Sequence, residues 1–156
     1  MNDKVRYDGS PRVVYAESVL AEAGFRARVV LPITDPYVKH HGSLGSFATV
    51  YLSEEDRADP QRRLAAMAAL RECPGVYQVF GREDAAHHFE LPADRIGDLV
   101  VLGDQNTVIG RTPEFHDLSQ VPHLRSHGGL DENEVPLWIN RTLTPDYSKL
   151  LTSGRG

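Results

Sequence analysis

Phe47-Ala48-Thr49-Val50-Tyr51-Leu52 is the segment from which the fold is most directly deduced. Larger apolar and smaller or polar side chains nearly alternate along it, which is the pattern of a β-strand with one buried face. Two β-branched segments precede it, at residues 12–16 and 26–33, and another apolar run follows at residues 76–80. The pattern therefore predicts four strands by residue 80.

Helical segments separate these strands. The first is expected from Glu17 to Ala23. The second begins at Asp59-Pro60, where an N-cap residue precedes a proline at the first helical position. Leu64, Met67 and Ala68 then form an apolar stripe at helical spacing, which predicts that this face of the helix contacts the core.

The resulting order is strand, helix, strand, strand, helix, strand, which is the βαββαβ pattern of a ferredoxin-like sandwich. We therefore expect a mixed α/β (α+β) fold. Residues 1–90 are expected to form a ferredoxin-like subdomain, and residues 91–156 a C-terminal segment.

Further elements are expected after the fourth strand. Glu83 to Phe89 predicts a short helix. Asp98 to Leu102 and Thr107 to Ile109 flank the turn Gly103-Asp104-Gln105-Asn106, which predicts a β-hairpin. Val135 to Ile139 is a short apolar run that predicts a buried closing strand.

The composition excludes several classes of protein. The chain has 156 residues and a formal net charge of −5, which argues against binding to nucleic acid or to an anionic membrane surface. Its single cysteine, Cys73, excludes an internal disulfide and fits a reducing compartment, where we expect it to be structural. Neither a signal peptide nor an apolar run long enough to cross a bilayer is present. These features predict a soluble, cytoplasmic protein.

Three of the seven histidines, His116, His123 and His127, lie within 12 residues. With Asp117 they form a candidate zinc set, because imidazole and carboxylate groups are ordinary zinc ligands. The segment is rich in Gly, Pro and Ser, so the gap from His123 to His127 is not a helical i, i+4 pair. Surface or hydrogen-bonded histidines are the alternative for His116 and His123.

The other histidines are weaker candidates. His40-His41 lie in a long loop from Thr34 to Ser46, where adjacent side chains point in opposite directions, so a structural or pocket-lining role is favoured over metal ligation. His87-His88 are expected to be solvated or half-buried. Ser43 or Ser46 beside His41 suggests a nucleophile and base, but no glycine-framed nucleophile elbow is present.

Two arginines are candidates for substrate binding. Arg95 lies in the charged turn Arg95-Ile96-Gly97-Asp98, for which the alternative is an ion pair that braces the loop. Arg125 immediately precedes Ser126-His127-Gly128-Gly129. Gly42-Ser43-Leu44-Gly45-Ser46 is spaced like a phosphate-binding loop, but it does not open a predicted helix.

Several long blocks, between about Asn2 and Arg141, resemble phosphonoacetate hydrolase, a family of the alkaline phosphatase superfamily near the nucleotide pyrophosphatase/phosphodiesterases. The blocks are Asn2-Asp3-Lys4, Ile33-Thr34-Asp35-Pro36-Tyr37-Val38 with His40-His41-Gly42, Leu44-Gly45-Ser46-Phe47-Ala48-Thr49-Val50-Tyr51-Leu52, Phe89-Glu90-Leu91-Pro92 with Asp94-Arg95-Ile96-Gly97-Asp98-Leu99-Val100-Val101, and Leu124-Arg125-Ser126-His127-Gly128-Gly129.

The resemblance implies a two-zinc site. In the family, Asp and His side chains hold two zinc ions and a metal-activated threonine attacks phosphorus. The threonine and most ligands belong to the N-terminal half, and further ligands follow in an Asp-His-Gly-Met segment whose last residue would be Met1. The final ligand, the histidine of Ser-His-Gly-Gly, corresponds to His127. No catalytic nucleophile is assigned to this chain, and its substrate contacts remain unassigned.

The function implied is that of a C-terminal portion of an enzyme that hydrolyses the carbon–phosphorus bond of phosphonoacetate to acetate and phosphate. The ferredoxin-like part would belong to the cap over the substrate, and the C-terminal segment would complete the core sheet. The chain alone is expected to be inactive. Two alternatives stay open: a free-standing, non-catalytic module that binds a small ligand or self-associates, and one half of a split enzyme. Exposed Leu137, Trp138 and Ile139 would favour a homodimer or aggregation.

Overall fold

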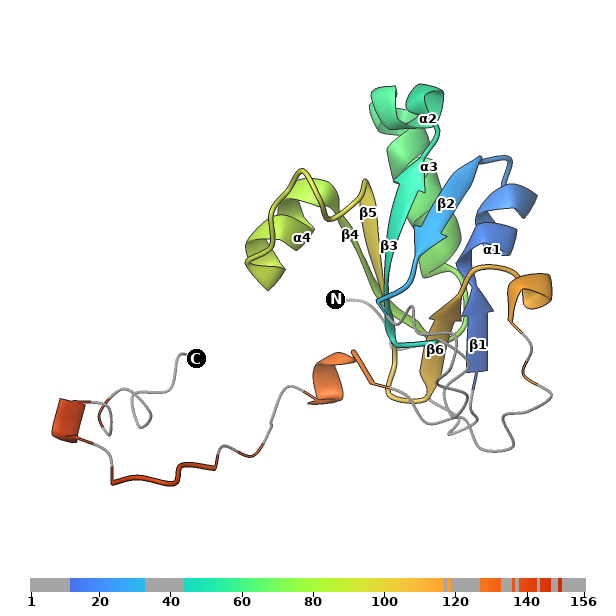
Figure 1. Ribbon diagram of the computed structural model, residues 1–156. Coiled ribbons are helices and arrows are strands. Elements are labelled where there is room, and N and C mark those ends of the chain that lie inside the picture. Colours follow the sequence, from blue (N-terminus) through green and yellow to red (C-terminus); the bar gives the residue numbers. More distant parts are fainter. Residues whose placement is uncertain are drawn as a thin grey trace.

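The computed structural model describes residues 12–32, 44–116, 118, 127–132, 136, 138–142, 144–146 and 149. Figure 1 shows the named elements, which in chain order are β1 (Arg12–Tyr15), α1 (Ala16–Glu22), β2 (Ala27–Val30), β3 (Phe47–Leu52), α2 (Glu54–Ala58), α3 (Pro60–Arg71), β4 (Val76–Gly81), α4 (Arg82–Phe89), β5 (Leu99–Gly103), β6 (Thr107–Gly110), and the 3-10 helices η1 (Pro113–Phe115) and η3 (Leu130–Glu132). The expected α+β class is confirmed.

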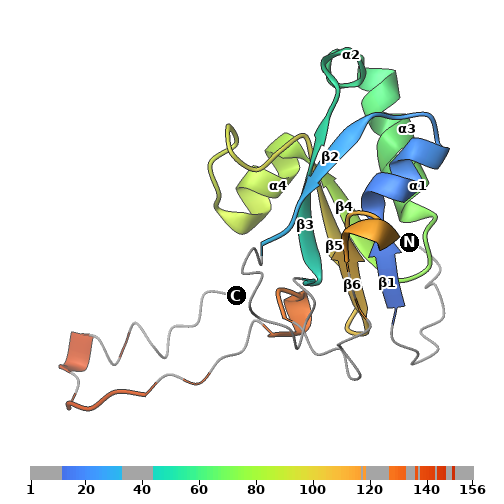
Figure 2. The ribbon, with the colours of Figure 1, turned by 45° about the vertical axis from the view of Figure 1, so that its right-hand side comes forward.

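A four-stranded antiparallel sheet forms the centre of the fold, in the order β2-β3-β5-β4. Its faces are covered by different helices, with α4 on one side and α1 and α3 on the other (Figure 2). The alternation expected for residues 47–52 is observed. Ala48, Val50 and Leu52 belong to the larger core with α1 and α3, whereas Phe47 packs in the smaller cluster under α4.

The connectivity of this sheet differs from the expected one. The first strand, β1, is not part of the sheet, and β5 lies between β3 and β4 instead. The unit β3-α3-β4 is thus split by a strand that follows it in sequence. All five residues of β5 are buried, as expected for a central strand with both faces covered.

The expected hairpin of residues 98–102 with 107–109 is wrong. β6 pairs in parallel with β1, with Val14 opposite Ile109. The physical reason is that both edges of β5 are already hydrogen-bonded, one to β3 and one to β4, so β6 has no edge of β5 to join.

The two sheets adjoin at the residues that precede β3. The amide of Ile109 donates to the carbonyl of Gly45 at 2.7 Å, and the amide of Gly103 donates to the carbonyl of Ser46 at 2.8 Å. β5 lies beyond the expected boundary at residues 90 and 91, yet it pairs with strands from before it. The division into residues 1–90 and 91–156 stays a prediction.

The main helix begins as the sequence predicts but presents a different stripe to the core. The Asp59 side chain accepts a hydrogen bond from the Gln61 amide at 2.8 Å, which confirms the N-cap. Met67 is buried, but Leu64 is 56% exposed and Ala68 is also exposed. The buried positions are Ala66, Met67 and Leu70, so the helix is rotated relative to the expected stripe.

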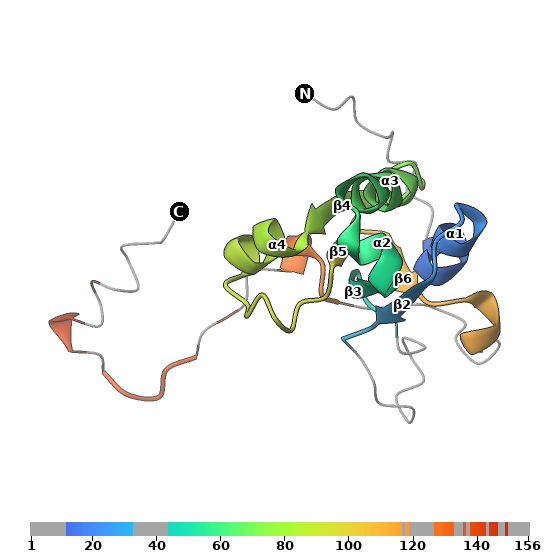
Figure 3. The same ribbon diagram turned by 90° about the horizontal axis from the view of Figure 1, so that it is seen from above.

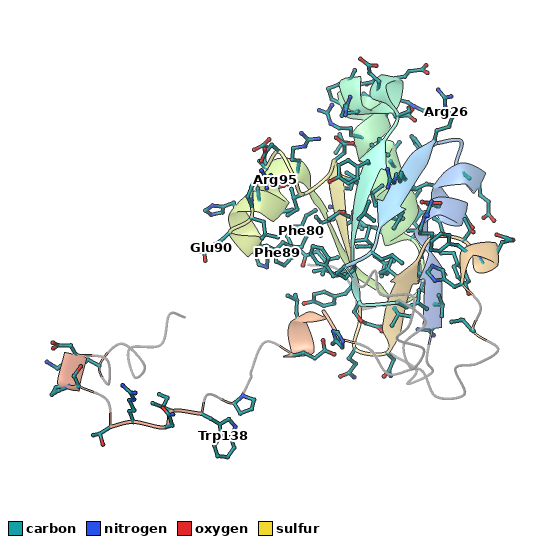
Figure 4. All side chains as sticks on the ribbon, viewed as in Figure 1. Arg26, Phe80, Phe89, Glu90, Arg95 and Trp138 are labelled. Carbon is teal, nitrogen blue, oxygen red and sulfur yellow. The ribbon has the colours of Figure 1, made fainter. Side chains whose placement is uncertain are left out.

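The closing strand expected at residues 135–139 is not found at those residues of the segment that the structure describes. Pro136, Trp138 and Ile139 have no strand assignment, and residues 135 and 137 lie outside the described set. Trp138 is 90% exposed, on an extended segment well away from both sheets (Figure 4). An apolar run predicts burial, but no described strand pairs with it. In the part of the chain that the structure describes, no helix has the length and apolar character needed to span a membrane.

Candidate functional site

An open pocket of about 610 Å³ lies where the end of α4 meets the beginning of β3. Figure 3, viewed from above, shows η3 on the α4 side of the sheet. The lining residues come from β3, α4, β5 and the turn that carries His127, and they are Phe47, His88, Phe89, Leu102, His127, Gly128, Gly129, Leu130 and Glu132. His127, the candidate metal ligand, is therefore exposed on a pocket.

Hydrogen bonds fix the backbone of the His127 turn. The amide of Ser46 donates to the His127 carbonyl at 3.1 Å. Gly128 has a φ of +90°, a left-handed conformation that glycine adopts without steric cost. The Glu132 carboxylate accepts from the Gly129 amide at 2.8 Å, as the acidic residue of a capping box does at a helix start. The turn is thereby attached to the residue that immediately precedes β3.

Ser46 also connects this turn to the first residue of β6. Its hydroxyl is buried and donates to the Thr107 carbonyl at 2.7 Å. The hydroxyl is thus engaged with the backbone, which does not support Ser46 as a nucleophile. Instead, the Ser46 hydroxyl fixes the residue just before β3, and the amide of the same residue holds the His127 carbonyl.

Aromatic rings cluster beside the turn, and Phe47, His88 and Phe89 of this cluster line the pocket. Phe47 and Phe89 make an edge-to-face contact with centroids 5.6 Å apart, and Phe80 packs on Phe89 in the same way at 5.5 Å. The His88 ring stacks on Phe80 at 5.0 Å with an interplanar angle of 23°. Figure 4 shows Phe80 and Phe89 between α4 and the sheet. This cluster is apolar apart from the His88 ring.

Three of the described pocket residues carry side chains of the kinds that bind metal ions. His88, His127 and Glu132 offer nitrogen and oxygen donors on one pocket, which suits zinc chemically. However, no three His, Cys, Asp or Glu side chains among the described residues are close enough together to hold an ion. Since a catalytic zinc normally takes three protein ligands, these residues do not make a complete zinc site. His127 as a zinc ligand stays a prediction.

The remaining zinc candidates divide into two groups. Asp117 and His123 lie outside the described residues. His116 is buried, and its Nε2 accepts a hydrogen bond from the Arg111 amide at 3.1 Å. The hydrogen-bonded alternative is therefore the observed one for His116, which does not line the pocket with His127.

The other candidates from the sequence have these outcomes. His40, His41, Ser43 and Arg125 lie outside the described residues. Arg95 has a side chain that is 82% exposed and is not among the pocket residues.

The loop that carries Arg95 is braced by a different pair. Asp98 is buried, pairs with Arg82, and accepts from the Leu52 amide at 2.8 Å. Arg95 itself lies 3.9 Å from Asp94, and both side chains are well exposed. The bracing interpretation of this turn is therefore supported, but through Asp98 and Arg82.

Several pocket residues were not singled out from the sequence. Phe47 and Phe89 were treated as parts of a strand and a helix, and His88 as a solvated or half-buried residue. His88 is indeed exposed, but on the pocket. Glu132 had a usable signal, because it follows Gly129 by three residues, the spacing of a capping box.

Two solved structures match most of the chain. A crystal structure of phosphonoacetate hydrolase from Sinorhizobium meliloti 1021 in complex with phosphonoacetate is 48% identical, with a TM-score of 0.64 over 81% of this chain. This chain is similar to phosphonoacetate hydrolase. A structure of the same enzyme with phosphonoformate is 46% identical, with a TM-score of 0.60 over 80% of this chain. No protein-family model matches the chain.

The resemblance found in the sequence is thereby confirmed. The match covers 30% of each phosphonoacetate hydrolase chain, which is consistent with the expected C-terminal portion.

Proposed function

We propose that this chain is part of a metal-dependent enzyme that hydrolyses the carbon–phosphorus bond of phosphonoacetate to acetate and phosphate. The observation that carries the proposal is the 48% identity, over 81% of the chain, to an enzyme whose structure contains phosphonoacetate. In such an enzyme, residues 1–90 would serve as a cap-type subdomain and residues 91–156 as the C-terminal segment. The ligand would be a small phosphonate.

His127 is the residue of this chain that we assign to the metal. Bound zinc would supply Lewis-acid polarisation of a phosphoryl oxygen. The chain's own contribution is to present the His127 imidazole on the pocket from a turn whose carbonyl is held by the Ser46 amide. We infer that the chain by itself does not turn over phosphonoacetate, because His127 is the one family ligand that the resemblance assigns to it.

Zinc binding and phosphate release test these assignments. In histidine ring NMR spectra, zinc is expected to shift the His127 signals first, and His127→Ala should remove that response while His87→Ala, an exposed histidine outside the pocket, retains it. Phosphate release from phosphonoacetate by the purified chain with zinc is expected to be absent. Robust turnover would contradict the inference that further ligands are required. The proposed site would be contradicted if the His127 signals of the wild-type chain shifted neither with zinc nor with phosphonoacetate.

A second candidate is a non-catalytic module that self-associates. The observation in its favour is the apolar segment at Trp138 and Ile139, which are 90% and 44% exposed. A split enzyme is the remaining alternative, and co-purification of a separate chain that restores phosphate release would identify it.

A further inference from the structure

α4 and the loop behind it, residues 82–95, lie on the sheet face that carries the smaller of the two apolar clusters. Among the described residues this cluster has three buried members, whereas the cluster shared by α1 and α3 has nineteen. Figure 2 shows the sheet between α4 and those two helices. A local opening costs less free energy when it exposes less apolar area, so α4 should open more easily than α3.

This segment is attached to the sheet at its two ends. Arg82, the first residue of α4, pairs with the buried carboxylate of Asp98. Asp98 is itself fixed to the sheet, because its amide donates to the Val50 carbonyl at 2.7 Å. Near the other end of the segment, the Tyr51 hydroxyl of β3 donates to the Arg95 carbonyl at 2.9 Å. The two attachments leave the last turn of α4 between them.

The last turn of α4 is the part of the segment that lines the pocket. His88 and Phe89 line it together with the turn that carries His127. Phe89 packs on the sheet through the edge-to-face contacts with Phe47 and Phe80. A movement of α4 away from the sheet would separate Phe89 from Phe47 and widen the pocket.

The backbone at the end of α4 is strained in the observed position. Glu90 has a φ of +53° and a ψ of +39°, the left-handed conformation that glycine usually occupies after a helix. A residue with a side chain adopts this conformation at a cost in free energy, which unwinding of the last turn would release. Figure 4 shows Glu90 at the end of α4 and Arg95 on the loop behind it. The strain therefore favours opening at the end that lines the pocket.

We propose that residues 82–95 form a lid on the pocket, which opens as a unit while the sheet and α3 stay folded and which closes when a ligand occupies the pocket. Closure on a ligand rests on the proposed function, in which the ligand is a small phosphonate. The open lid gives access to the pocket. The closed lid places His88 and Phe89 beside the His127 turn, where they exclude water and so strengthen the electrostatic interactions of a bound anion.

Hydrogen exchange of the full chain, followed by NMR, tests the opening without any ligand. The amides of α4 and of Leu91 are expected to share one opening equilibrium and to exchange faster than the amides of α3. Tyr51→Phe removes the hydroxyl that holds the Arg95 carbonyl. It should accelerate exchange in the lid about fivefold, the effect of one hydrogen bond, and leave α3 unchanged. Tyr77→Phe, at an exposed tyrosine of β4, is the matched control and should alter neither.

Glu90→Gly should act in the opposite direction. Glycine removes the strain at the end of α4, so exchange in the lid should slow about threefold while α3 again stays unchanged. The lid is wrong if α4 and α3 share one opening equilibrium in the wild-type chain. It is equally wrong if Tyr51→Phe and Glu90→Gly leave the ratio of the two exchange rates as it was.

Addition of zinc and phosphonoacetate tests closure and separates it from the function on which it rests. Lid exchange is expected to slow at the ligand concentrations that shift the His127 ring signals, because a ligand that binds the closed form protects it. If the His127 signals shift and lid exchange does not slow, closure is wrong while the phosphonate site stands. If the His127 signals do not shift, the phosphonate site fails, and the ligand-free exchange rates still decide whether the lid opens as a unit.

Discussion

Glu132 acts at the scale of one hydrogen bond. Its carboxylate closes the turn that presents His127 by accepting the Gly129 amide. The His127 carbonyl, three residues in front of the 3-10 helix, is held separately by Ser46. The orientation of one candidate ligand thus depends on two hydrogen bonds, and the one that the Glu132 side chain accepts can be tested by a single substitution.

We expect Glu132→Ala to loosen this turn and Glu132→Gln to preserve it, because a glutamine oxygen still accepts the Gly129 amide. Loss of a cap costs about 1 kcal/mol, which corresponds to roughly fivefold faster amide exchange at Gly129. Hydrogen exchange measured by NMR checks this. Equal protection of Gly129 in the alanine and glutamine variants would show that the carboxylate does not hold the turn.

Asp56 gives the chain a pH-dependent contribution to stability. A hydrogen bond from the Ser53 hydroxyl, followed by one from Arg62, lowers the pKa of this carboxyl group below its ordinary value. A carboxyl group with a depressed folded-state pKa stabilises the fold above its unfolded pKa. That contribution is lost as the pH falls below about 4 toward the folded-state pKa.

The expected result is a free energy of unfolding that decreases on acidification, with a shallower decrease in Asp56→Asn. Denaturant unfolding at a series of pH values measures both slopes. Asp94→Asn is the control, because the Asp94 side chain is 79% exposed and lies 3.9 Å from Arg95. A profile for Asp56→Asn that superimposes on the wild-type profile would rule out this contribution.

At the scale of elements, side chains block both edges of the four-stranded sheet. β2 and β4 are the edge strands, and their outward backbone groups would otherwise be free to pair with another chain. The Glu17 carboxylate accepts the Val29 amide of β2 at 2.7 Å. The Arg71 guanidinium donates to the Val79 carbonyl of β4 at 2.7 Å. Each edge is therefore occupied by a charged side chain from a helix.

Arg71→Ala is expected to expose the β4 edge and increase self-association. The cost in folding free energy should be small, about 1 kcal/mol for one hydrogen bond, whereas the fraction of large species in sedimentation velocity should rise. Arg63→Ala on the same helix is the matched control, because its guanidinium contacts the Arg57 carbonyl and no sheet edge. The edge-blocking role of Arg71 would be contradicted by identical sedimentation profiles of the two variants.

At the scale of the whole molecule, the two sheets meet where Gly45 and Ser46 precede β3. Gly45 bridges to Ile109 of the two-stranded sheet, and the Ser46 amide holds the His127 carbonyl. The pocket thus depends on the joining of the two sheets. The apolar segment at Trp138 lies apart from this junction (Figure 4).

Trp138 is expected to report self-association. As the single tryptophan, it should emit at long wavelength in dilute solution, and its emission should shift to the blue as concentration rises and the side chain becomes covered. Trp138→Ser should reduce the oligomer fraction in sedimentation equilibrium, whereas Leu64→Ser, at a side chain that is 56% exposed on α3, should leave it unchanged. A protein that stays monomeric at high concentration would exclude the association.

Much of the fold follows from local patterns. The alternation of residues 47–52 and the N-cap at Asp59 are correct because both depend on neighbouring residues, whereas the expected helical stripe was wrong at Leu64 and Ala68, which are exposed. The partners of each strand were not predictable in this way. Pairing depends on which strand edges are free in the assembled sheet. A turn such as residues 103–106 is compatible with a hairpin, but also with a following strand that pairs in a different sheet.

The amino-acid sequence by itself determined the α+β class, the strand and helix segments up to residue 110 except α2, and the similarity to phosphonoacetate hydrolase, from which the prediction for His127 follows. Tertiary structure alone decided that β5 lies between β3 and β4, that β6 joins β1, and that His88 shares a pocket with His127. The physical reason is distance along the chain. Local periodicity is set within a few residues, whereas the pocket brings together Phe47, His88 and His127 through contacts that exist only after the sheet has closed.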